Sequence, residues 1–158
     1  MDATFNLETA VFNYRVAAIM IEKNHVLVHK QVNDQHWALP GGRVEVLEDS
    51  RTSITREIKE ELGLDIIVNN LLWFTENFFE YNQKNFHEIG LYYEVSFKSQ
   101  PIFSSEVFYG EEGERLIYKW TPIDELGDLV LYPEFLKSSL KKLPKSTEHV
   151  VIGKNLEF

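Results

Sequence analysis

The chain has 158 residues, of which 44% are hydrophobic and 26% charged, and this size and composition are typical of one globular domain over residues 1–158. The net charge of −9 argues against duplex DNA binding, because such proteins need a basic face to displace counterions. The absence of cysteine excludes disulfides and thiolate metal sites. The first residues lack the basic start of a signal peptide and no apolar run is long enough to span a bilayer, so we expect a cytoplasmic protein without membrane association.

The first part of the chain predicts short strands and a tight turn. Residues 14–21 and 26–29 are apolar and β-branched, and the four polar residues between them predict a β-hairpin. Residues 37–39 predict a short strand that ends at the Pro-Gly-Gly segment 40–42. Two glycines after a proline are typical of a turn in which the backbone approaches another group closely.

A helix is predicted next. Asp49 or Ser50 can cap its first turn, and Gly63 is a suitable residue to end it after Leu62. Apolar residues recur at every fourth position and predict the face that packs on a sheet. These residues are Ile54, Ile58 and Leu62.

Three carboxylates of this helix lie on one flank. At about 100° per residue, Glu57, Glu60 and Glu61 all fall on the same side of the apolar stripe. Like charges at this spacing repel each other by a few tenths of a kcal/mol per pair. A divalent cation would convert that repulsion into binding, and Mg²⁺ prefers oxygen ligands of this kind.

The second half of the chain predicts more strands than helices. The predicted strands are residues 65–80, 87–98, 116–120 and the tail segment 149–153, with a turn at 81–85, a loop at 101–114 and a helix at 133–140. Two helices flanking a set of strands favour an α+β fold or an α/β/α sandwich.

The stretch Gly42-x5-Glu48-x7-Arg56-Glu57-Ile58-x-Glu60-Glu61-x-Gly63-Leu64 resembles the signature of the Nudix hydrolases. All seven specified residues and both apolar positions match without a gap. The flanking segments, a WxLPGG turn before and KWTPIDEL after, are also similar to the family. The resemblance therefore implies a Nudix-like α/β/α sandwich with a mixed β-sheet and the family's loop-helix motif.

The resemblance also implies an activity. Nudix hydrolases cleave the pyrophosphate bond of a nucleoside diphosphate linked to another moiety, using Mg²⁺, for which Mn²⁺ can substitute. It implies that Glu57, Glu60 and Glu61 are metal ligands and catalytic residues, together with the carbonyl oxygen of Gly41. Arg56 and Glu48 then form an ion pair that fixes the loop onto the helix.

Two aspects of the site stay open at the level of sequence. The general base is either a glutamate of the helix or one of the distal glutamates, which are Glu111, Glu112 and Glu114, with Glu88 behind them. Substrate contacts are expected from Arg43, Trp37 and Glu112, where Arg43 would meet phosphates and Trp37 would stack on a base.

Two other functions compete with hydrolysis of a small nucleotide. A Nudix-fold sensor would bind a nucleotide without turnover, but such domains usually lose a helix carboxylate, and this chain retains all of them. An enzyme acting on RNA 5′ ends needs few backbone contacts, although the negative charge and lack of a basic stripe argue against it. An edge strand and an aromatic-rich surface are compatible with a homodimer.

Overall fold

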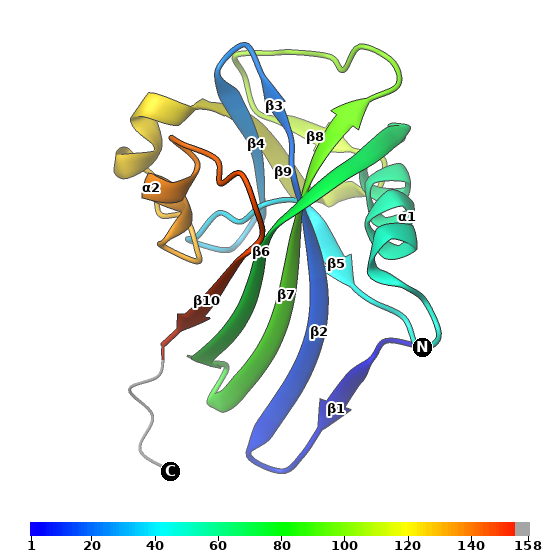
Figure 1. The fold of residues 1–158 in the computed structure, drawn as a ribbon, viewed down its shortest axis with the longest axis vertical. Helices are drawn as coiled ribbons and strands as arrows, with labels where there is room; N and C mark the ends of the chain where they lie inside the picture. Colours follow the sequence, from blue (N-terminus) through cyan, green and yellow to red (C-terminus); the bar gives the residue numbers. More distant parts are fainter. Residues whose placement is uncertain (154–158) are drawn as a thin grey trace.

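The computed structural model describes residues 1–153, which form two β-sheets flanked by helices (Figure 1). The larger sheet has the order β1-β2-β7-β6-β10, with β5 also paired to β2. Its strands are β1 (Thr4–Asn6), β2 (Ala10–Ile19), β5 (Gly41–Arg43), β6 (Ile66–Tyr81), β7 (Lys84–Phe97) and β10 (Glu148–Ile152). The sheet is mixed, because β2 pairs with β7 in parallel and β10 pairs with β6 in parallel, while the other pairs are antiparallel.

The smaller sheet has the order β3-β4-β9-β8. Its strands are β3 (Ile21–Glu22), β4 (His25–Gln31), β8 (Phe108–Gly110) and β9 (Gly113–Pro122). The helical segments are α1 (Ser50–Leu62), the 3-10 helix η1 (Ile123–Asp128) and α2 (Leu136–Ser139).

Two buried clusters join these layers. Ile54 and Ile58 of α1 are fully buried in the first cluster, against Val16 of β2 and Tyr118 of β9. The second cluster contains Leu136 of α2 and residues of both sheets, and in Figure 1 α1 and α2 lie on opposite sides of the strands. The predicted α+β class, with a mixed sheet between helical layers, is therefore confirmed.

The predicted hairpin at 14–29 is correct only at its tip. Strand β2 belongs to the larger sheet, and the hairpin consists of β3 and β4, with Ile21 opposite Val26 and Glu22 opposite His25. The apolar run 14–21 divides because its first part pairs with β7, a partner about seventy residues away that local sequence does not reveal.

Three other predicted elements differ from the structure. Residues 37–39 make only isolated bridges, from Ala38 to His29 and from Trp37 to Leu131. The predicted loop 101–114 contains β8 and the start of β9, which pair as a hairpin. The predicted helix 133–140 is reduced to the four residues of α2.

Other predictions are confirmed. Helix α1 has the expected bounds, β6 and β7 form an antiparallel pair whose turn lies at Asn82-Gln83, and the tail segment forms β10. Within residues 1–153, no helix is long and apolar enough to cross a membrane.

Candidate active site

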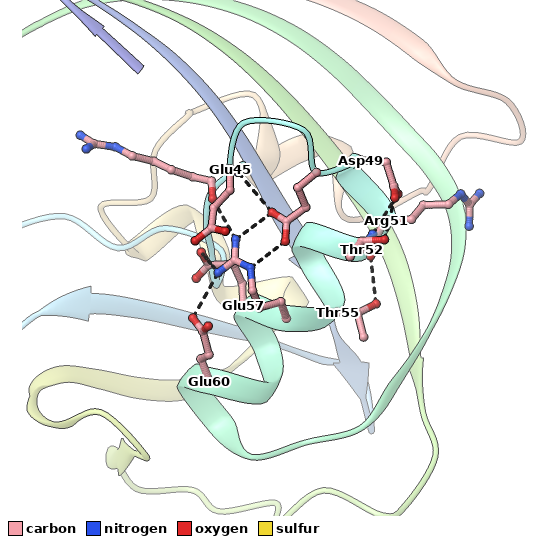
Figure 2. A network of polar contacts seen from close by, with 10 residues as sticks. Glu45, Asp49, Arg51, Thr52, Thr55, Glu57 and Glu60 are labelled. Carbon is pink, nitrogen blue, oxygen red and sulfur yellow. Dashed lines mark hydrogen bonds and ion pairs between the residues drawn. The ribbon is translucent and has the colours of Figure 1, made fainter. Parts of the chain in front are cut away.

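The position of α1 is fixed at both ends. Asp49 is the N-cap, and its carboxylate accepts hydrogen bonds from the Thr52 backbone N–H at 3.0 Å and the Thr52 hydroxyl at 2.6 Å (Figure 2). Ser50 does not cap the helix, because its hydroxyl contacts the Tyr93 hydroxyl at 2.6 Å. Gly63 ends the helix in the left-handed conformation, with φ of 68°, as its sequence position predicts.

Arg56 is the centre of an ion-pair network. Its Nε and Nη2 donate to the two carboxylate oxygens of Glu48 at 2.8 and 2.9 Å, and its Nη2 also donates to the Arg43 carbonyl at 3.3 Å. Its Nη1 contacts Glu57 at 3.0 Å and Glu60 at 3.2 Å (Figure 2). The guanidinium holds the pKa of Glu48 down at about 2. This paired geometry attaches the loop before α1 to the helix itself.

The glycine pair 41–42 leaves room for a carboxylate and for a neighbouring strand. A Cβ on Gly42 would overlap the Glu57 carboxylate, and one on Gly41 would overlap the Val16 carbonyl oxygen. Strand β5 therefore lies against β2 on one side and against Glu57 on the other. A larger residue at either position would displace one of these groups.

Glu61 is a buried carboxylate that forms no ion pair with a lysine or arginine of residues 1–153. Its side chain accepts a hydrogen bond from the Tyr118 hydroxyl at 3.4 Å and lies 3.8 Å from His29 Nδ1. Burial, and then the negative charges of Glu57 and Glu112, raise the pKa of Glu61 to about 8. Burial also lowers the pKa of His29 to about 3, so the imidazole is neutral at physiological pH and does not balance the carboxylate.

The carboxylates of α1 are suitable ligands for a divalent cation, but they are not arranged around a preformed metal site. Among residues 1–153, no group of three or more His, Cys, Asp or Glu side chains is arranged to hold a metal ion. Glu57 and Glu60 point to Arg56, whereas Glu61 points to Tyr118 and His29. However, burial and neighbouring charge raise the pKa of both Glu57 and Glu61, and a cation between them would remove that penalty. The carboxylate oxygens of α1 are ligands of the kind that Mg²⁺ prefers.

The distal glutamates lie beside the end of α1. The Glu111 backbone N–H donates to the Glu61 carbonyl at 2.7 Å, so the β8–β9 turn is attached to the helix. Glu112 pairs with Arg115 at 2.8 Å, and its charge contributes to the raised pKa of Glu61. Glu114 is exposed.

The predicted substrate contacts lie in different places. Arg43 is on β5, with its guanidinium 3.6 Å from Asp2 at the surface. Two ammonium groups lie over the Trp37 ring, with Lys30 Nζ 5.3 Å and Lys119 Nζ 5.4 Å from its centroid. The structure therefore places Trp37 with lysines rather than with the helix glutamates.

Sequence analysis missed the residues that surround Glu61. His29, on β4, and Tyr118, on β9, both approach its carboxylate. Both strands carry other polar residues, so the position of His29 or Tyr118 in its strand did not distinguish it in the sequence.

Comparison with known proteins agrees with this geometry. The family model described as NUDIX domain matches residues 11–143, which is most of the chain. The chain belongs to the Nudix family. This confirms the resemblance seen in the sequence, and with it the prediction of a Nudix pyrophosphohydrolase.

The individual relatives of this Nudix chain have low sequence identity to it. An 8-oxo-dGTP diphosphatase of Buchnera aphidicola subsp. Schizaphis graminum is 29% identical over 115 residues, covering 70% of this chain and 78% of that protein. The crystal structure of a MutT Nudix hydrolase from Burkholderia pseudomallei matches with a TM-score of 0.58 and 24% identity, over 72% of this chain and 84% of that one. A MutT protein from Bacillus halodurans matches with a TM-score of 0.60 and 16% identity, over 87% and 89%. At these identities the structural likeness shows the fold.

Proposed function

We propose that this Nudix protein hydrolyses the pyrophosphate bond of a nucleoside diphosphate linked to another moiety, in a reaction that depends on Mg²⁺, with Mn²⁺ as an alternative. The observation that carries the proposal is the placement of Glu61, which is buried near the charges of Glu57 and Glu112, with the neutral Tyr118 hydroxyl and His29 imidazole against its carboxylate. A protein without a cation to bind would gain stability by replacing this side chain with a neutral one.

When bound, Mg²⁺ would neutralise pyrophosphate oxygens and lower the pKa of the attacking water. The residues that would hold it are Glu57 and Glu61, with Glu60 and the Gly41 carbonyl as further oxygen donors. Arg56 and Glu48 act on these ligands indirectly. Their ion pair holds the loop before α1, and the Arg56 bond to the Arg43 carbonyl holds β5, which carries Gly41 and Gly42, near the helix.

The general base is either a glutamate of α1 or one of the distal glutamates 111, 112 and 114. One residue of each group is the better candidate. Glu61 has a raised pKa, which suits proton transfer near neutral pH. In the distal group Glu112 is the residue whose charge acts on Glu61, although its own carboxylate is paired with Arg115.

The substrate is expected to be a small nucleotide. The relative named 8-oxo-dGTP diphosphatase supports a nucleoside triphosphate as the first candidate, and an ADP-ribose pyrophosphatase from Streptococcus suis shares the fold with a TM-score of 0.52 over 88% of this chain and 98% of that one, at 16% identity. A cytoplasmic location and a homodimer stay predictions.

A substrate panel tests the proposal. Nucleoside triphosphates, ADP-ribose, nucleotide sugars, dinucleoside polyphosphates and nucleotide coenzymes are incubated with protein and Mg²⁺, and nucleotide products are separated by chromatography. We expect a nucleotide product from at least one compound, and none when EDTA replaces Mg²⁺. Tight binding of a nucleotide without any product would instead identify a sensor, and salt-dependent RNA binding would support action on RNA ends.

A further inference from the structure

Three polar side chains form a cluster on the larger sheet, away from the Arg56 network. Asn13 and Arg15 are two residues apart on β2, so their side chains lie on the same face of the sheet. Glu88 of β7 is opposite Asn13, and Asn13 Nδ2 lies 3.5 Å from Glu88 Oε2. Further along the same face, Ile19 joins the buried cluster between the two sheets.

The hydrogen-bonding capacity of this cluster is largely unused. Asn13 is 3% exposed, and its side-chain oxygen accepts from the Thr4 hydroxyl at 3.2 Å. In residues 1–153, the long contact from Asn13 is the single hydrogen bond that the Glu88 carboxylate receives, although a carboxylate can accept about four. Arg15 is half-buried, and within the same part of the chain its side chain makes neither a hydrogen bond nor an ion pair.

Arg15 of β2 is opposite Arg43 of β5, and the neighbouring Gly42 lies against the Glu57 carboxylate. The positive charge of Arg15 also opposes the effect of burial on the pKa of Glu88. Along β2 Arg15 is about 7 Å from Asn13, at 3.3–3.4 Å per residue. The cluster therefore extends from the place where the pyrophosphate is expected toward the outer part of the sheet.

We propose that Asn13, Arg15 and Glu88 form a binding site for the nucleoside monophosphate part of a guanine nucleotide. In this site Arg15 binds the phosphate next to the nucleoside and Glu88 binds the base. The assignment rests on the proposed function, because it needs a nucleotide whose pyrophosphate lies at the α1 glutamates.

The chemistry of a carboxylate selects the base. An ionised carboxylate only accepts hydrogen bonds, and its two oxygens suit two neighbouring N–H donors. Guanine presents its ring N1–H beside its 2-amino group. Hypoxanthine lacks that amino group, and adenine presents a ring nitrogen that accepts, which would face the carboxylate without a proton between them.

The test measures binding of reaction products, so it does not depend on turnover. GMP, IMP, AMP and guanosine are titrated by calorimetry, in buffer with Mg²⁺, into the wild type and the variants Glu88→Gln and Arg15→Gln. Glu94→Gln is the matched control, since Glu94 is on the same face of β7, about 20 Å further along the strand. Thermal melts confirm that each variant is folded.

We expect the wild type to bind GMP at least about tenfold more tightly than IMP or AMP, and Glu88→Gln to abolish that preference. Arg15→Gln should weaken GMP binding by about tenfold or more and leave guanosine binding unchanged. Equal wild-type affinities for the three nucleotides, or an unchanged GMP preference in Glu88→Gln, would overturn the assignment. If the substrate panel shows turnover but Glu88→Gln keeps the GMP preference, this inference is wrong and the proposed hydrolysis stands. If the protein binds GMP selectively but turns over no compound of the panel, the proposed hydrolysis is wrong and the base recognition stands.

Discussion

Replacing Glu61 with Gln should change how the stability of the metal-free protein depends on pH. The pKa of Glu61 is raised in the folded state to about 8, against 4.5 when unfolded, so the folded state binds the proton more tightly. Its contribution to stability is complete below pH 4.5 and is lost as pH rises toward 8. Glutamine carries no charge at any pH and should remove this loss.

His29 acts in the opposite direction over a lower pH range. Its pKa is lowered to about 3 in the folded state from 6.5, so its contribution is complete above pH 6.5 and is lost as pH falls toward 3. Between pH 4.5 and 6.5 the two effects offset each other. Between pH 6.5 and 8 the effect of Glu61 stands without that of His29, and at 1.36 kcal/mol per pH unit it amounts to about 2 kcal/mol.

The assay is urea unfolding in EDTA at pH 5.5, 6.5, 7.2 and 8. The free energy of unfolding of the wild type should fall by about 2 kcal/mol from pH 6.5 to 8, and that of Glu61→Gln should stay level and exceed it at pH 8. Glu60→Gln is the control, because Glu60 lies on the same helix with its side chain half exposed. A wild type that is equally stable at pH 6.5 and 8, or a Gln variant that is less stable in EDTA, would refute the reasoning.

Three further predictions concern the same site. Arg56→Lys cannot reproduce the two bonds to Glu48 and the contact with Glu57, so it should lower the free energy of unfolding by about 1–3 kcal/mol. The control Lys59→Gln removes a surface ion pair and should change the free energy of unfolding by less than about 1 kcal/mol. Equal effects of the two variants in urea unfolding would contradict the network. Gly42→Ala should displace the Glu57 carboxylate and weaken Mn²⁺ binding, measured by calorimetry, with the fold retained. Gly127→Ala is the control, because a Cβ there meets nothing within 4 Å, and it should bind Mn²⁺ with wild-type affinity. Equal affinities of the two variants would show that Glu57 does not hold the metal. Adding Mg²⁺ should raise the melting temperature of the wild type at pH 8 and leave Glu61→Gln nearly unchanged, and an equal shift in both would place the cation elsewhere.

Local sequence predicted the parts of the fold that depend on local interactions. Asp49 and Gly63 are capping residues whose effect is confined to one helical turn, so both ends of α1 were predicted. The β6–β7 pair was predicted for a similar reason, since Asn82 and Gln83 close a two-residue turn between strands that are adjacent in sequence.

The elements that were missed depend on distant partners. Strand β2 pairs in parallel with β7, and a parallel partner is not specified by any turn between the two strands. Residues 108–113 were predicted as a loop because of their acidic turn. They form a short hairpin instead, and the Glu111 backbone N–H attaches this hairpin to α1.

The candidate site divides in the same way. The resemblance of residues 42–64 to the Nudix signature predicted that Arg56 pairs with Glu48, and both lie on α1 and the loop before it. It did not predict His29 or Tyr118, since these come from other strands and reach Glu61 only through the folding of the smaller sheet. The burial of Glu61 by these side chains is a property of packing, which sequence spacing does not encode.

The turnover of Glu57→Gln tests the central claim most directly. With the best substrate of the panel and Mg²⁺ varied, kcat of Glu57→Gln should fall by at least about a hundredfold relative to wild type, because charge that holds the metal stabilises the transition state. Lys59→Gln, two residues along the same helix, should retain wild-type kcat. Wild-type turnover in Glu57→Gln at the same Mg²⁺ concentration would contradict a cation site on the α1 glutamates.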